Sequence, residues 1–109
     1  MRLAIFTTLP LLLGAAYANY YVDCDDDKGH HEKKNEPMKT GDHSECHQFD
    51  YGMKNFEYWQ DDGNNYDFEF FEDSECKGKK HKGKAEKEKK NKKKSKSPKD
   101  CWSYIAYCE

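Results

Sequence analysis

Histidine, cysteine and acidic residues gather in two short stretches of this 109-residue chain, where they could bind a metal ion or transfer protons. The stretch His43–His47 (HSECH) places several such side chains together, and His30 and His31 follow the aspartates of Asp23–Asp27. Zinc sites usually take Cys and His in pairs about two to four residues apart and repeat the pair. That repetition is absent from this sequence. We therefore predict no metal site and no cofactor, and we interpret these histidines as exposed loop residues.

A second chemistry to consider is that of small secreted ribonucleases, which combine His, Glu and an Arg that neutralises the phosphate. His47 with Glu57 or Glu69 could supply the first two groups. The one arginine, Arg2, lies in a segment that we expect to be removed, and lysine lacks the bidentate guanidinium fork. The sequence shows no Ser-His-Asp pattern and no glycine-rich phosphate loop. We predict no catalytic residues and no enzymatic activity, and we keep a ribonuclease-like hydrolase as a remote alternative.

Charge is divided very unevenly along the chain. The segment Lys77–Asp100 holds thirteen lysines against three acids, a formal charge of about +10, whereas residues 19–76 hold seventeen acids against five lysines, about −12. The net charge of −2 conceals this division. Because the lysine-rich segment contains only one aliphatic residue, Ala85, and no aromatic, it cannot bury enough apolar surface to offset its ordering entropy. We predict that it is a long disordered loop.

Three interpretations of this lysine-rich segment are open. It could be a solvated insertion, it could attract polyanions such as nucleic acid, anionic lipid or acidic polysaccharide, or it could fold back onto the acidic half of the chain. The run Lys89–Lys99 also resembles a nuclear localisation signal. The predicted polyanion-binding residues are Lys79, Lys80, Lys82, Lys84, Lys89, Lys90, Lys92, Lys93, Lys94 and Lys96.

The chain has five cysteines, an odd number, which allows two disulfides with one free thiol or an intermolecular bridge that forms a dimer. An oxidising compartment favours pairing, but the spacing does not determine connectivity. We favour Cys24 with Cys108, which would tie the chain ends together, and Cys76 with Cys101, which would close the lysine loop. Cys46 is then the free thiol.

The first eighteen residues have the layout of a secretory signal peptide: Arg2, an apolar centre over Leu9–Ala16, and small residues before a cleavage site preceding Asn19. The apolar centre is shorter than the about 20 residues that span a bilayer, so we expect no stable membrane insertion. We predict a secreted, extracellular protein, with translocation into a host cell left open.

The elements that must position these residues are expected to be strands. All leucines lie in the predicted signal segment, so any core must be built from aromatic rings. Tyr66–Phe70 alternates rings with carboxylates, and the turn-like Asp61–Asn65 precedes it, which predicts a β-hairpin over residues 55–72. We also expect strands at Asn19–Asp23 and Cys101–Cys108, and an exposed loop over residues 24–42.

Short motifs resemble known secreted proteins. The signal ending in Ala-Tyr-Ala, the aromatic start Tyr20–Cys24 and the terminal Cys108 resemble small secreted cysteine-containing proteins of filamentous fungi, many of them candidate effectors of pathogens; the start is also similar to that of small β-sandwich effectors. Phe70–Gly78 resembles a segment of small crystallin-like secreted β-proteins. The resemblance implies a secreted, β-rich, disulfide-linked and non-enzymatic protein with a role in virulence.

Together these observations predict a mainly β protein, a small disulfide-linked antiparallel β domain with a long disordered lysine-rich loop. Its expected parts are a signal peptide (1–18), an acidic aromatic β-rich region (19–76), the disordered loop (77–100) and a C-terminal closing strand (101–109). The predicted function is that of a secreted effector-like binding protein that engages a host protein or a polyanion through the loop and exposed aromatics. The alternative is a secreted antimicrobial or toxin-like protein acting on anionic membranes or nucleic acid.

Overall fold

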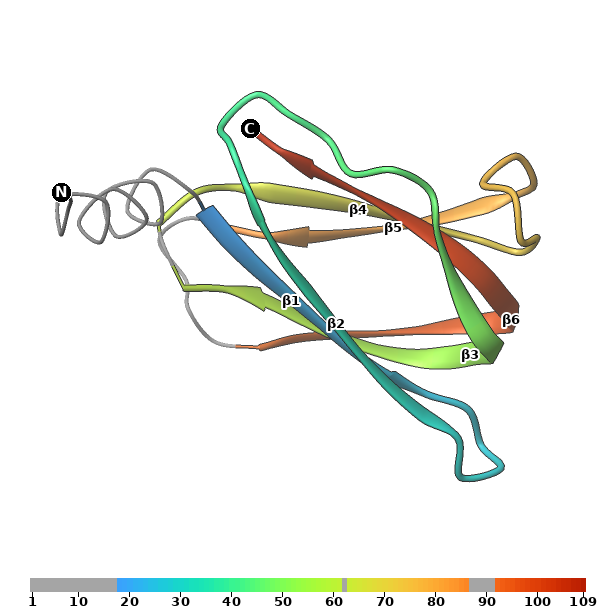
Figure 1. Cartoon of the computed structure of the whole chain (residues 1–109). Coiled ribbons are helices and arrows are strands. Elements are labelled where there is room, and N and C mark those ends of the chain that lie inside the picture. The colour runs from blue at the N-terminus through green and yellow to red at the C-terminus, as the bar shows by residue number, and fades with distance from the viewer. Residues whose placement is uncertain (1–17, 62, 87–91) are drawn as a thin grey trace, which may run out of the picture.

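A computed structural model describes residues 18–61, 63–86 and 92–109, and within them the chain forms six strands and no helix (Figure 1). The strands are β1 (Ala18–Asp25), β2 (His31–Met38), β3 (His47–Gln60), β4 (Tyr66–Phe71), β5 (Lys80–Ala85) and β6 (Lys93–Cys108). All neighbours are antiparallel, in the order β2-β1-β3-β6-β4-β5. The predicted mainly β, antiparallel, disulfide-linked fold is confirmed. The predicted signal peptide lies outside the described residues except for Ala18, which begins β1.

The single sheet folds over on itself because β3 and β6 are long and change direction. β6 pairs through Lys93–Lys96 with the second half of β3 and through Ser103–Cys108 with β4. Between these two parts the register of β3 against β6 shifts on either side of Met53, as a bulged and strongly twisted ladder does. Figure 1 shows both strands turning at the right-hand end of the molecule. The β2-β1-β3 part of the sheet therefore faces the β4-β5 part across a core.

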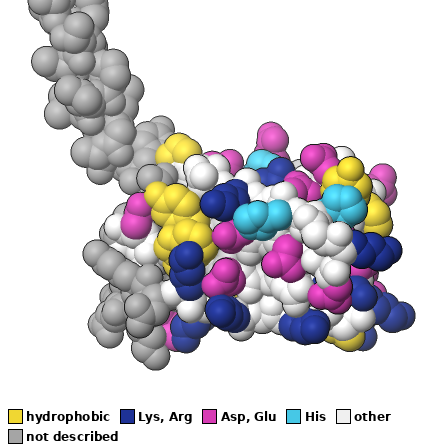
Figure 2. All heavy atoms as spheres, turned by 90° about the horizontal axis from the view of Figure 1, so that it is seen from below, with side chains coloured by type: hydrophobic (Ala, Val, Ile, Leu, Met, Phe, Trp, Pro, Cys, Tyr) yellow, Lys and Arg dark blue, Asp and Glu magenta, His cyan; other side chains and the backbone are white. Residues whose placement is uncertain are grey.

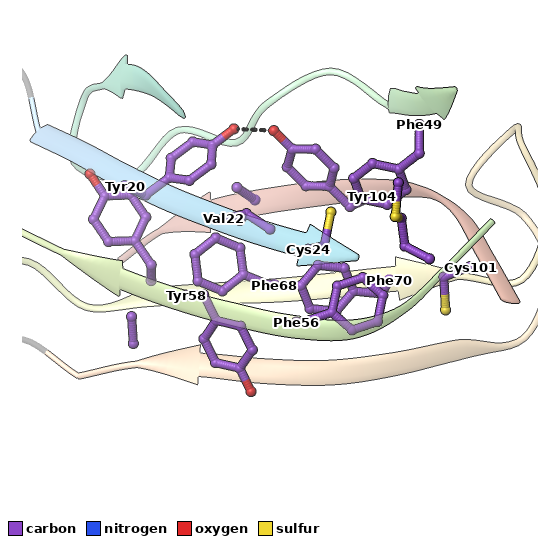
Figure 3. Close-up of a cluster of buried hydrophobic side chains, with 14 of the residues drawn as sticks. Tyr20, Val22, Cys24, Phe49, Phe56, Tyr58, Phe68, Phe70, Cys101 and Tyr104 are labelled. Carbon is purple, nitrogen blue, oxygen red and sulfur yellow. Dashed lines mark hydrogen bonds between the residues drawn. The ribbon is translucent and has the colours of Figure 1, made fainter. Parts of the chain in front are cut away.

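Aromatic rings fill this core, as the sequence predicts (Figure 3). Phe56 of β3 stacks on Phe70 of β4 with ring centroids 4.1 Å apart, and Tyr20 of β1 meets Phe68 of β4 edge-on at 5.5 Å. The hydroxyl groups of Tyr20 and Tyr104 hydrogen-bond each other at 2.7 Å inside the core. Burial raises the pKa of both tyrosines above the usual value, so both hydroxyls stay protonated. Rings from both parts of the sheet thus replace the missing aliphatic residues.

The predicted hairpin over residues 55–72 is wrong in its pairing, although both of its strands exist. β6 lies between β3 and β4 in the sheet, so these two strands share no ladder. Their apolar faces instead meet across the core, where Tyr58 lies 5.2 Å from Phe68 between ring centroids. Alternation shows that a strand has one buried face, but two such faces can pack face to face as well as lie side by side.

The expected exposed loop over residues 24–42 is also wrong in part, because β2 pairs with β1 along its whole length. Gly29, at φ 102°, lies in the tight turn between them. β2 is an edge strand, and its inward-facing acids have partners: Glu36 accepts hydrogen bonds from the Tyr20 hydroxyl (3.0 Å) and from His47 (2.9 Å). The charges that suggested a loop are those of a protected sheet edge. The strands expected at residues 19–23 and 101–108 are confirmed within β1 and β6.

The predicted disordered loop over Lys77–Asp100 is not what the described residues show. β5 and the first half of β6 both lie in this segment, and residues 87–91 lie outside the described part of the chain. In β5 the lysines alternate with His81, Gly83 and Ala85: the lysines point to solvent, Ala85 is buried in the core, and His81 pairs with Glu72. β5 completes the backbone hydrogen bonding of β4, which offsets ordering entropy without burying large apolar side chains.

The predicted disulfides are wrong. The structure joins Cys46 to Cys76, two residues that were predicted to be the free thiol and half of the lysine-loop bridge. Cys24, Cys101 and Cys108 are buried thiols on β1 and β6, facing the ring core, whereas Cys46 and Cys76 lie just before β3 and in the segment after β4. With a sequence separation of 30, the bond lowers the entropy of the unfolded chain and so stabilises the fold by about 3–4 kcal/mol. The predicted intermolecular bridge stays a prediction.

Candidate binding surfaces

Lysines of β5 lie opposite acids of β4 on one outer face of the sheet. Lys84 is the register partner of Asp67, and Lys82 that of Glu69. Lys80 Nζ lies 2.8 Å from Glu69 Oε2 and Lys84 Nζ 3.8 Å from Asp67 Oδ1. Partial desolvation acts to raise the pKa of Glu69, but hydrogen bonds from Lys80 and from the Tyr107 hydroxyl outweigh it and lower that pKa. The basic strand is thus neutralised in part by its own neighbour.

A similar arrangement covers the outer face of β2, β1, β3 and β6. Asp23 of β1 lies between Lys33 of β2 and Glu57 of β3, and Glu57 is in turn the register partner of Lys94 on β6, with 4.0 Å between Lys94 Nζ and Glu57 Oε2. Acids of the central strands are therefore flanked by cations on both outer strands. Figure 2 shows lysine and acidic side chains interspersed on the face seen from below, rather than separated by sign.

The predicted polyanion-binding lysines therefore do not form one mobile group. Lys80, Lys84, Lys93 and Lys94 make ion pairs with acids. Lys92 places its Nζ 4.6 Å from the ring centre of Trp59, which also stacks on Tyr21 at 5.3 Å. Lys79, Lys82 and Lys96 make no ion pair within the described residues, whereas Lys89 and Lys90 lie outside them. Lys80, Lys84 and Lys94 pair with acids of residues 19–76, as the folding-back interpretation expects, whereas Lys93 pairs with Glu86 of its own tract.

At the bend of the sheet two aromatic side chains are left exposed to solvent. Tyr51 of β3 is 48% exposed and Trp102 of β6 is 39% exposed, although most other rings lie in the core. Both line one groove of about 240 Å³, which we call the aromatic groove. Its other lining residues include the acids Asp26, Asp27 and Asp100 and the cations Lys28 and Lys54. The groove combines two aromatic walls with a rim of both charge signs.

Tyr51 is held in place by the turn between β1 and β2. Its ring stacks on that of His30 with 3.6 Å between centroids and 9° between planes. His30 Nδ1 in turn lies 2.7 Å from Asp26 Oδ2, and the backbone N–H groups of Lys28 and His30 donate to Asp26 Oδ1 at 2.8 and 2.9 Å. Partial desolvation of Asp26 opposes these hydrogen bonds, but they prevail and lower its pKa to about 2. This wall of the groove is therefore preorganised, and its Asp26 carboxylate is ionised at neutral pH.

A close approach of β3 and β6 fixes the floor of the groove. A Cβ atom at Gly52 would lie 2.6 Å from Cβ of Asp100, so no larger residue fits there without displacing a strand. Gly52 directly follows Tyr51, and Asp100 lies two residues before Trp102. The contact at this glycine therefore brings the two exposed rings to the same end of the molecule.

The histidines serve mainly as hydrogen-bond partners of acids. His47 hydrogen-bonds Glu36 and not Glu57 or Glu69, so the acid–base pair considered for a ribonuclease is not formed. Glu36 also accepts a hydrogen bond from the Tyr20 hydroxyl, which is in turn bonded to the hydroxyl of Tyr104. His31 pairs with Asp23, and His81 Nε2 lies 2.8 Å from Glu72 Oε2. Among the described residues no group of three or more His, Cys, Asp or Glu is arranged to hold a metal ion.

The buried thiols of Cys24 and Cys101 are held in their protonated, unreactive form. Burial, followed by the charges of nearby acids, raises the pKa of Cys24 to about 12. Burial also raises the pKa of Cys101, although a hydrogen bond with Ser97 acts in the opposite direction. A thiol rather than a thiolate is a poor nucleophile and a poor metal ligand, so neither side chain is a catalytic candidate.

Sequence reasoning named exposed aromatics as a binding element but did not find which ones. Alternation from Tyr104, Ala106 and Cys108, which are all buried, would place Trp102 inside as well. The bend in β6 interrupts the alternation of buried and exposed residues, so that Trp102 faces outward. A clearer signal existed for the lysines, because Lys80, Lys82 and Lys84 alternate with smaller residues with the period of a strand.

Comparison of this chain with known protein families, with characterised proteins and with solved structures finds no match in any of the three. The resemblances to fungal effectors and to crystallin-like proteins therefore stay predictions. In the described part of the chain there is no helix that is long and apolar enough to cross a membrane.

Proposed function

We propose that this chain is a secreted, effector-like binding protein without catalytic activity, and that it recognises its partner through the aromatic groove. The observation that carries the proposal is that Tyr51 and Trp102, the exposed large apolar side chains of the described residues, line the same groove. Aromatic side chains contribute a large contact area with little conformational freedom to lose, which is why they dominate binding sites.

Preorganisation supports the same proposal. The stack on His30 and the hydrogen bonds to Asp26 hold the Tyr51 wall, while the contact of Gly52 with Asp100 holds the two strands together. A site whose walls are fixed before binding loses less entropy when the partner arrives. Of the kinds of partner predicted from the sequence, a host protein suits this groove better than a polyanion such as nucleic acid or acidic polysaccharide, because three of the lining residues are carboxylates.

The lysine strands have a secondary role in this proposal. Several of their ammonium groups are paired with acids of the same sheet, so a polyanion would have to compete with those acids. A membrane-active toxin needs a cationic surface beside an apolar one, whereas here cations and acids are interspersed. The structure thus gives the antimicrobial alternative less support than a binding role.

Two measurements test the proposal. Expression with the native N-terminus in a eukaryotic secretion host is expected to release protein that begins at Asn19 and carries the bond between Cys46 and Cys76, as peptide mass mapping would show. Intact protein that keeps its first eighteen residues and stays in the cytosol would contradict secretion.

The second measurement is the retention of labelled protein on plant, fungal and animal cell surfaces. A Tyr51→Ala/Trp102→Ala variant is expected to lose most of this retention, because both walls of the groove disappear. The matched control is Tyr21→Ala/Trp59→Ala, which removes the stacked pair on the sheet face. Equal retention by both variants would rule out the groove as the recognition surface.

A further inference from the structure

We propose that the aromatic groove binds a neutral sugar ring of a polysaccharide or glycan. This inference rests on the proposed function, since it names the ligand of the same groove. It begins from the two kinds of group that line the groove: the rings of Tyr51 and Trp102, and a rim that mixes carboxylates with ammonium groups. Each kind selects for one property of a sugar.

The rings suit one face of a sugar. A pyranose presents a patch of axial C–H bonds, which carry partial positive charge, and an aromatic face is negative because of its quadrupole. Tyr51 has one face against His30, and yet nearly half of its surface remains open to solvent. Trp102 supplies a second, larger ring to the same groove. Such a pair can hold a flat amphipathic ring without a hydrogen bond to either side chain.

The rim discriminates between charged and neutral ligands. Asp26, Asp27 and Asp100 can only accept hydrogen bonds when ionised, whereas Lys28 and Lys54 can only donate them. The low pKa of Asp26 keeps it ionised throughout the physiological range. A polyanion would meet three carboxylates, and a basic peptide would meet two ammonium groups. A sugar hydroxyl donates and accepts at once, so a neutral polyhydroxyl ligand can bond to both kinds of group without bringing a like charge to either.

The size of the groove fits one or two sugar rings and not a longer segment. Its volume of about 240 Å³ lies below the about 300–1,000 Å³ of pockets that enclose drug-sized ligands. A longer glycan would therefore be held at one ring, with the rest of the chain in solvent. We expect weak binding to a single oligosaccharide and stronger retention on a surface that displays many copies.

The experiment is a titration followed by tryptophan fluorescence. The chain has two tryptophans, so a Trp59→Phe variant leaves Trp102 as the single reporter in the groove. Neutral probes are cellohexaose, mannohexaose and the N-acetylglucosamine tetramer; acidic probes are oligogalacturonate and heparin; the basic probe is a lysine octapeptide. We expect a saturable change with at least one neutral probe and none with the charged probes.

Variants then locate the site by isothermal titration with the neutral probe that binds. Tyr51→Ala and Trp102→Ala should each weaken binding by about tenfold, as the loss of one ring contact predicts. Asp100→Asn should also weaken it, whereas the controls Tyr21→Ala and Lys96→Gln should not. Denaturant unfolding of each variant separates a lost contact from a lost fold.

The outcomes separate this inference from the proposed function. Binding only of an acidic probe or only of the lysine peptide, with loss in the Tyr51 and Trp102 variants, would overturn the neutral sugar and leave the groove as a recognition site. Failure of all probes to bind would also overturn the sugar assignment. Neutral-sugar binding that survives both groove substitutions would overturn the location of the site and the proposed function with it.

Discussion

The core and the outer faces of this protein use different forces to hold the same strands. Between the two parts of the sheet, rings such as Phe56 and Phe70 stack at 4.1 Å and exclude water. On the outer faces, charged pairs such as Lys80 with Glu69 at 2.8 Å lie at the surface, where water screens them. A segment with few apolar side chains can therefore still form a strand when its neighbours supply backbone hydrogen bonds and opposite charges.

The largest effect is expected from Phe68→Ala, which removes a ring from the middle of the core. Phe68 is fully buried and contacts Tyr20, Tyr58 and Phe70. Large-to-small substitutions of this kind cost about 3–5 kcal/mol because they leave a cavity. Denaturant unfolding measures the free energy. A loss as small as that of a surface substitution would mean that the two parts of the sheet do not pack as described.

A smaller but still clear loss is expected from Gly83→Ala, where the lysine-rich strand meets the core. The new Cβ would lie 2.5 Å from Cζ of the Tyr58 ring, too close for the ring to stay in place. Overpacking typically costs about 1–3 kcal/mol. Thermal or urea unfolding of this variant beside Lys82→Ala gives the comparison. If β5 were a mobile loop, the two substitutions would have equal and negligible effects.

The charge pairs are expected to matter less. Glu69→Gln removes the charge that pairs with Lys80 and weakens the acceptor of the Tyr107 hydroxyl. Because Lys80 is nearly half exposed, screening limits the loss to about 0.5–1 kcal/mol at low salt. The difference between wild type and variant should shrink at high salt. Lys96→Gln serves as the control, and an equal loss in the control would contradict a specific role for the pair.

The smallest effect is expected at Asp26, and it shows as a dependence of stability on pH between about 2 and 4. Its pKa is lowered from the usual 3.8 to about 2 in the folded protein, so the folded state favours the ionised form. The resulting contribution to stability is complete above about pH 4 and is lost as the pH falls toward 2. Asp26→Asn should flatten that part of the stability profile, measured by unfolding from pH 2 to 6. An unchanged profile would contradict the hydrogen bonds described around this carboxylate.

Much of the core could be predicted from the sequence, because alternation and the absence of leucine after the first segment leave only rings to fill it. The partners of each strand could not be predicted in the same way. Tyr66–Phe71 has a clear buried face, but the sequence between it and β3 does not show that β6 comes between them. Strand order depends on long-range pairing, which local patterns do not contain.

The sequence predicted neither the lysine-rich strand nor the aromatic groove, each for a different reason. Composition indicated disorder over Lys80–Ala85, but the stabilising partner is the acidic edge of β4, contributed by a different segment. The exposure of Trp102 depends on the bend in β6, which changes the phase of alternation. The disulfide was missed because Cys24 and Cys101 look like bridge candidates by position, although both face the ring core.

The buried thiols give this molecule a built-in reporter of its own opening. A thiol reagent in solution cannot reach Cys24 or Cys101 while the two parts of the sheet stay closed. The rate at which the reagent labels these thiols therefore measures how often the two parts of the sheet open and the rings separate. The same shielding means that an oxidant meets these sulfurs only before the two parts of the sheet have closed or while they are open again, so closure protects both thiols from wrong pairing.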